Sequence, residues 1–71
     1  MKKRSIAIRG HRTSIALEGE FWVVLETAAA ARGLSLPALI AEIDANRLAK
    51  SPAPGLASAL RVYALKRGMS S

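Results

Sequence analysis

The fold is decided by the stretch RTSIALEGEFWVVLETAAAARGLSLPALIAEID, which occupies residues 12–44. In its first six residues, larger or β-branched side chains alternate with a second set that is smaller or polar. One face of an extended chain then carries Thr13, Ile15 and Leu17, and the other carries Arg12, Ser14 and Ala16. Strict alternation of this kind predicts a half-buried strand whose first set faces a core.

Two helices are expected to follow the strand. Over residues 18–32, apolar side chains recur at spacings of three and four, at Phe21, Trp22, Leu25, Ala28 and Ala29. Gly33 supplies the usual left-handed stop, and Ser35 is a natural N-cap for a second helix over residues 35–48. Pro37 fits the first turn of that helix, where backbone N–H groups lack intrahelical partners.

Further elements are expected on both sides of this stretch. Residues 4–9 read RSIAIR and also alternate, so the strand is predicted over about residues 4–17. Gly10 marks either a bulge in one ribbon or a turn between two strands. The segment SPAPG at residues 51–55 breaks the chain, and a third helix is predicted over residues 56–67. No internal repeat is expected.

The length of 71 residues predicts one domain spanning residues 1–71. Chains this short usually need disulfides, a metal or oligomerisation to hold a fold. The sequence has no Cys and one His, so neither a disulfide nor a His/Cys metal cluster is expected, and no cofactor is expected either. Oligomerisation remains, and a homodimer is predicted on this ground.

The positive charge lies at one end of the chain. The formal net charge is +6, and residues 1–12 carry five basic residues and no acidic one. A local basic cluster attracts polyanions, of which nucleic acid is the commonest in the cytoplasm. No long apolar run follows this cluster and none approaches the length of a membrane span, so we expect a cytoplasmic protein without a membrane partner.

With a strand, a helix, a Gly-x-Ser link and a second helix in this order, residues 12–48 resemble the ribbon-helix-helix DNA-binding proteins, the MetJ and Arc type. The flanking segments RSIAIRGH at residues 4–11 and SALRVYAL at residues 58–65 resemble a bacterial subfamily with additional elements at both ends, including a C-terminal helix. The resemblance implies an intertwined homodimer in which the N-terminal strands of two copies pair antiparallel. A two-stranded ribbon of this kind fits the major groove of B-DNA.

The resemblance also implies a DNA-contacting site. Its base-contacting residues would be Arg12, Ser14 and Ala16, and Ala16 departs from the polar residue often found there. The start of the second helix would hold phosphates through Leu34, Ser35 and Leu36, where Pro37 removes one donor. Further phosphate contacts are expected from Lys2, Lys3, Arg4, Arg9 and His11. The dimer core would contain Ile15, Leu17, Phe21, Trp22, Leu25, Leu39, Ile40 and Ile43.

These observations predict a sequence-specific transcriptional regulator, a repressor, whose partner is double-stranded DNA. The alternative is an antitoxin or protein-binding adaptor that uses the same dimeric fold and has a protein partner. Dimers could also assemble into a higher oligomer on adjacent DNA sites. An enzyme is not expected, because the sequence offers no nucleophile–base pair, metal cluster or phosphate-binding Gly loop.

Overall fold

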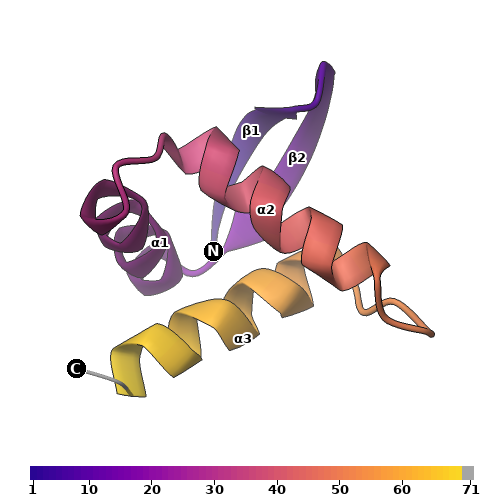
Figure 1. The fold of residues 1–71 in the computed structure, drawn as a ribbon. Coiled ribbons are helices and arrows are strands. Elements are labelled where there is room, and N and C mark those ends of the chain that lie inside the picture. Colours follow the sequence, from indigo (N-terminus) through magenta and orange to yellow (C-terminus); the bar gives the residue numbers. More distant parts are fainter. Residues whose placement is uncertain (70–71) are drawn as a thin grey trace.

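The computed structural model describes residues 1–69, which form a two-stranded sheet followed by three helices (Figure 1). The strands are β1 (Lys2–Ile8) and β2 (His11–Leu17). The helices are α1 (Gly19–Ala31), α2 (Leu36–Leu48) and α3 (Leu56–Met69). This order confirms the predicted class, a mainly helical fold with a β-ribbon ahead of two helices and a third helix after them.

The ribbon is a hairpin within one chain. Arg9 and Gly10 connect the strands with φ values of 49° and 81°. Positive φ at both central residues is typical of a type I′ turn, whose twist matches that of the flanking strands. Gly10 therefore belongs to a turn and not to a bulge.

The register of the hairpin defines the strand pairing within one chain. Residue pairs run from Lys2 opposite Leu17 to Ile8 opposite His11, with Ser5 opposite Ser14 near the middle. Within one chain, the partner of residues 12–17 is therefore β1. This pairing agrees with the second of the two alternatives for Gly10, a turn between two strands. Pairing between copies stays a prediction, and it now concerns the edge of β2 that faces away from β1.

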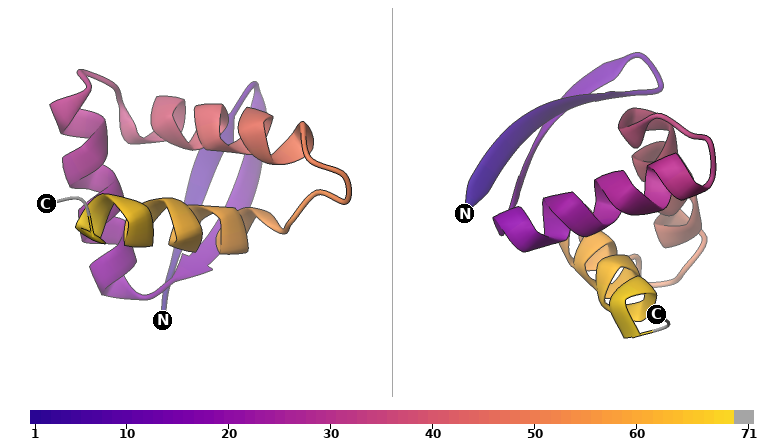
Figure 2. Two further views of the ribbon diagram at one scale, coloured as in Figure 1. Left: turned by 60° about the horizontal axis from the view of Figure 1, so that its bottom comes forward. Right: turned by 90° about the vertical axis from the view of Figure 1, so that its left-hand side faces the viewer.

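The three helices cover one face of the hairpin and leave the other face free (Figure 2). Ile6 and Ile8 from β1 and Ile15 and Leu17 from β2 lie on the covered face, and all four are buried. They continue into a core with Trp22 and Leu25 of α1 and with Leu39, Ile40 and Ile43 of α2. Burial of a large apolar side chain contributes about 1.5–3 kcal/mol, so this core supplies most of the stabilisation.

The third helix closes the core of the single chain. α3 packs against both α1 and α2, and its Leu60 and Ala64 are 0% and 2% exposed. A lone chain of this length usually leaves much of its apolar surface exposed, but this chain does so only in part. Val23, Val62 and Leu65 remain exposed on α1 and α3, but the centre of the core is filled without a second copy.

The link between α1 and α2 follows the predicted signals. Gly33 has a φ of 68°, and the Leu34 N–H donates to the Ala29 carbonyl at 2.9 Å, which closes the end of α1. The Ser35 hydroxyl accepts a hydrogen bond from the Ala38 N–H at 3.2 Å and caps α2. These hydrogen bonds define the conformation of the link and therefore the direction in which α2 leaves α1.

Among residues 1–69, no single helix is long and apolar enough to cross a membrane. The pair α1 and α2 together meets a test of length and composition, although the two helices are bent by 99°. Trp22, Leu25, Leu39 and Ile40 of this pair are buried inside the chain's own core.

Candidate nucleic-acid interface

The free face of the hairpin carries the three residues expected to contact bases. Arg12 and Ser14 are exposed and Ala16 is partly exposed. Because side chains alternate along a strand, the residues paired with them lie on the same face. Those partners are Ala7 opposite Arg12, Ser5 opposite Ser14 and Lys3 opposite Ala16, and all three are exposed. We call this six-residue surface, made of Lys3, Ser5, Ala7, Arg12, Ser14 and Ala16, the outer face.

The outer face is positively charged. The segment from Lys2 to Leu17 contains no acidic residue. Within the part of the chain that the structure describes, Lys3 and Arg12 form no ion pair. Both cations are therefore available to an anion from outside the protein.

Two other basic residues of the hairpin form ion pairs with carboxylates on the helix-facing side. The Arg4 guanidinium lies 5.0 Å from the centre of the Trp22 ring and forms an ion pair with Glu26 at 3.0 Å. Arg9, at the turn, forms an ion pair with Asp44 of α2. Both residues were expected to contact phosphates, but their carboxylate partners make them weaker candidates than Lys3.

Asp44 connects the hairpin turn to the helices. Its carboxylate also accepts a hydrogen bond from Arg47 at 2.6 Å, and Arg47 donates to the Pro54 carbonyl at 3.1 Å. Asp44 is 7% exposed, unlike most carboxylates on helices, which face solvent. The reason is that the turn folds back over α2 and brings Arg9 to this carboxylate.

Lys2 and His11 lie at the two ends of the hairpin. Both are exposed, and the register places them opposite Leu17 and Ile8, on the helix-facing side. The Lys2 carbonyl accepts a hydrogen bond from the Trp22 Nε1–H at 2.9 Å, which ties this end of β1 to α1. Their proposed phosphate contacts would therefore be made at the margins of the outer face.

The start of α2 was the other expected phosphate site. Ser35 is exposed, and Leu34 and Leu36 are partly buried against the core. Any phosphate contact there would use the backbone N–H groups of Ser35 and Leu36, since the Leu34 N–H already donates to the Ala29 carbonyl. Asp44 pairs with the hairpin turn from the C-terminal half of α2, so residues 34–36 lie at the other end of this helix.

The residues predicted for a dimer core lie in the core of one chain. Phe21 is partly buried against that core, and the others are buried in it, namely Ile15, Leu17, Trp22, Leu25, Leu39, Ile40 and Ile43. Their burial is thus explained within a single chain, and a role between two copies stays a prediction.

The remaining carboxylates with arginine partners sit on the helical side of the molecule. The Arg32 guanidinium lowers the pKa of Glu42, and the same pair raises the pKa of Arg32. A hydrogen bond from its own backbone N–H lowers the pKa of Glu18, and Arg61 at 3.1 Å lowers it further. These ion pairs keep negative charge on the helices and their margins, so the outer face stays positive.

Sequence reasoning missed the contribution of β1 to the outer face. The segments KRSIAI at residues 3–8 and RTSIAL at residues 12–17 repeat one pattern, a basic residue followed two and four positions later by Ser and Ala. The chain therefore contains one short repeat, contrary to the expectation from the sequence. The repeat can be read from the sequence, but a segment of six residues is too short to be recognised as a repeat before the strand register pairs the two copies.

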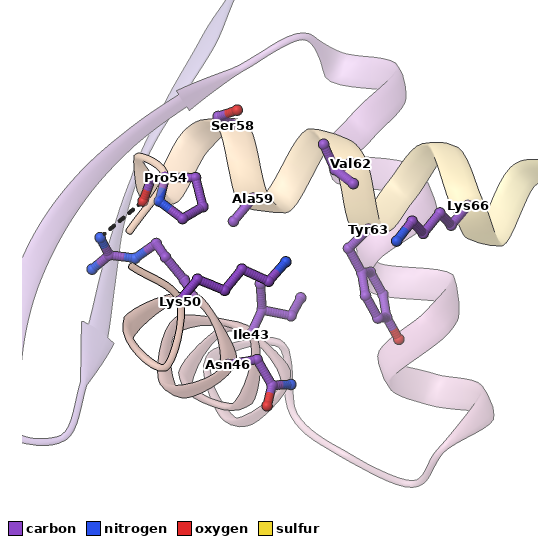
Figure 3. Close-up of a pocket in the computed structure, with 10 residues that line it drawn as sticks. Ile43, Asn46, Lys50, Pro54, Ser58, Ala59, Val62, Tyr63 and Lys66 are labelled. Carbon is purple, nitrogen blue, oxygen red and sulfur yellow. Dashed lines mark hydrogen bonds between the residues drawn. The ribbon is translucent and has the colours of Figure 1, made fainter. Parts of the chain in front are cut away.

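A separate cleft of about 250 Å³ lies between α2 and α3 (Figure 3). Ile43, Ala59 and Val62 form apolar parts of its wall, and Lys50 and Lys66 extend along it. Of the residues that the structure describes, no acidic residue and no His lines it. Residues 1–69 also contain no group of three or more His, Cys, Asp or Glu that could hold a metal ion.

Comparison with known protein families shows to which family this chain belongs. Residues 1–67 match the ribbon-helix-helix domain. The chain belongs to the ribbon-helix-helix family. This confirms the resemblance of residues 12–48 and extends it to β1 and most of α3.

Ribbon-helix-helix proteins are DNA-binding regulators that generally act as dimers, and their domain is not an enzymatic fold. Comparisons with curated proteins and with solved structures give no significant match. The family membership therefore rests on the domain match and on the order of elements.

Proposed function

We propose that this ribbon-helix-helix protein is a bacterial, sequence-specific transcriptional repressor that binds double-stranded DNA in the major groove as a homodimer in the cytoplasm. The observation that carries the proposal is the outer face of the hairpin. It is largely exposed and lacks acidic residues, and its Lys3 and Arg12 form no ion pair within residues 1–69. A two-stranded ribbon of this width fits the major groove.

Sequence discrimination would come mainly from Arg12. Its guanidinium can donate two hydrogen bonds to O6 and N7 of guanine, the commonest specific contact in the major groove. The Ser14 hydroxyl can donate or accept and therefore discriminates less, and Ala16 can contact a thymine methyl group. The polar contacts of β2 thus lie toward its N-terminal end.

Phosphate contacts would surround these bases. The main candidates are Lys2, Lys3 and His11 of the hairpin and the backbone N–H groups of Ser35 and Leu36 at the start of α2. Such contacts fix orientation and carry no sequence information directly. They would make the affinity fall steeply with salt concentration.

The antitoxin alternative receives less support. Antitoxins usually hold a toxin with an extended C-terminal segment that folds on its partner. In this protein the C-terminal residues up to Met69 form α3, which packs on α1 and α2 of the same chain.

The proposal is tested by selecting bound duplexes from random DNA and measuring the affinity for selected and unselected duplexes. We expect saturable binding and a clear preference. Arg12→Ala should reduce that preference by roughly 5- to 150-fold, which corresponds to one lost guanine contact.

Lys50→Ala is the matched control, because it removes one positive charge from the α2–α3 cleft and not from the hairpin. It should leave the preference unchanged. Failure of the wild-type protein to bind any duplex saturably at low salt, with folding confirmed by circular dichroism, would refute the proposal.

A further inference from the structure

We infer that the hairpin of a single chain is the complete DNA-contacting ribbon, in which Lys3 and Ser5 of β1 contact bases as counterparts of Arg12 and Ser14 of β2. This inference rests on the proposed function and assigns base contacts to β1, a strand to which the family resemblance assigns none. Lys3 was expected to contact only phosphates.

The first argument is the local symmetry of the hairpin. The repeated segments at residues 3–8 and 12–17 are paired so that Ser5 lies opposite Ser14. A two-fold axis between these two serines would carry Lys3 onto the position of Arg12 and Ala7 onto the position of Ala16. The outer face of one chain thus has the approximate two-fold symmetry that two identical strands would have in a dimer.

The same symmetry holds on the covered face. The axis relates Ile6 to Ile15 and Ile8 to Leu17, and these four side chains are 6%, 4%, 7% and 0% exposed. β1 therefore occupies the structural place of a second ribbon strand on both faces, in side-chain direction as well as in hydrogen bonding.

The second argument is the width of the ribbon. Neighbouring strands are about 4.8 Å apart, so a hairpin fits a major groove that is about 12 Å wide. Pairing β2 of two copies would make a four-stranded sheet with its outermost strands about 14 Å apart, before side chains are counted. The unit that matches the groove is the hairpin of one chain.

The third argument is that the hairpin is already fixed to its own helices. At one end, the Lys2 carbonyl is bound by the Trp22 indole N–H at 2.9 Å. At the other end, Arg9 pairs with Asp44, which Arg47 holds at 2.6 Å. A ribbon anchored at both ends does not need a second copy to hold its shape.

The expected DNA chemistry follows from the positions of the two cations. Arg12 lies opposite Ala7, and Ala7 is four residues along β1 from Lys3. The two basic side chains are thus about 13 Å apart along the ribbon and on different strands. Both can donate to O6 and N7 of guanine, so one chain would contact a short, approximately inverted element with a guanine toward each end.

The test is a set of DNA selections with the full chain and the variants Lys3→Ala and Arg12→Ala, both at exposed positions whose loss leaves the core intact. Lys3→Ala should relax the preference at one base pair of the element and Arg12→Ala at the symmetry-related base pair. Each loss should be roughly 5- to 150-fold. Lys3→Arg should keep the preference, because arginine makes the same guanine contact.

Two results would overturn the inference. If a ribbon made of β2 from two copies contacts the bases, Arg12→Ala will relax both related base pairs and Lys3→Ala will relax neither. If Lys3→Ala weakens selected and random DNA by the same factor, Lys3 contacts only phosphate. In both cases Arg12→Ala still loses preference, so the proposed function survives. An unchanged preference in Arg12→Ala, or no binding by the wild-type protein, would instead count against the proposed function itself.

Discussion

Both faces of the hairpin carry basic residues, but those paired with carboxylates lie on the helix-facing side. The helix-facing side carries Arg4 and Arg9, and each is paired with a carboxylate of α1 or α2. The outer face carries Lys3 and Arg12, which have no partner among residues 1–69. Basic charge therefore attaches the hairpin to the helices on one side and remains available to a polyanion on the other.

This difference shows that counting basic residues overestimates the DNA-contacting charge. The first twelve residues hold five cations, but alternation along the strands divides them between the two faces. Substitutions on the helix-facing side should therefore change stability, and substitutions on the outer face should change DNA binding.

The largest effect is expected for Leu17→Ala on the helix-facing side. Leu17 is fully buried among the core residues, so its truncation removes apolar contacts and leaves a cavity. The free energy of unfolding should fall by about 2–5 kcal/mol, measured by urea denaturation. Ser14→Ala on the outer face is the control and should stay within about 0.5 kcal/mol of the wild-type protein. Equal losses in both variants would contradict the division between the faces.

A smaller loss is expected for Asp44→Ala. This substitution leaves Arg47, whose side chain is 21% exposed, without its carboxylate partner and releases Arg9 at the turn. The free energy of unfolding should fall by about 1–3 kcal/mol, less than for a fully buried ion pair because Arg9 is half exposed. The matched control is Arg12→Ala, which unpairs no carboxylate and should leave the stability nearly unchanged. A stability loss in Arg12→Ala as large as in Asp44→Ala would show that the outer face is also structural.

The smallest of the three effects is expected for Gly10→Ala, because the turn joins the two faces without burying a side chain. At a φ of 81° an added Cβ meets no neighbouring atom, so the cost is backbone strain of about 1–2 kcal/mol. Gly19→Ala is the control, since Gly19 has open space and no positive φ. Thermal unfolding should show a lower melting temperature for Gly10→Ala alone. A Gly10→Ala protein as stable as the Gly19→Ala protein would argue against the type I′ turn.

Much of the fold could be predicted because its signals are local. The helix stripes, Gly33 and the Ser35 cap each act over a few residues, and the observed helices begin and end close to the expected residues. Alternation also indicated which face of β2 is buried. These features depend on backbone periodicity and capping, which short segments of sequence record directly.

The pairing partner of β2 and the burial of Asp44 could not be predicted in this way. Both depend on where the chain goes after it reverses at Arg9 and Gly10, and a glycine alone does not distinguish a bulge from a turn. The role of α3 in closing the core is a third case, since its apolar stripe is equally compatible with packing on another copy. For the candidate site, the alternation of β2 marked the exposed Arg12 and Ser14, whereas the placement of Lys3 and Ser5 beside them needed the register.

The central claim is that DNA binds the outer face of the hairpin, and an NMR titration of the isotope-labelled protein with its selected duplex tests it most directly. The account predicts that the largest shifts of assigned resonances occur at Lys3, Ser5, Arg12 and Ser14, and that Val62 and Leu65 on α3 change little. Large shifts confined to α3 and the α2–α3 cleft, with the hairpin unchanged, would contradict it.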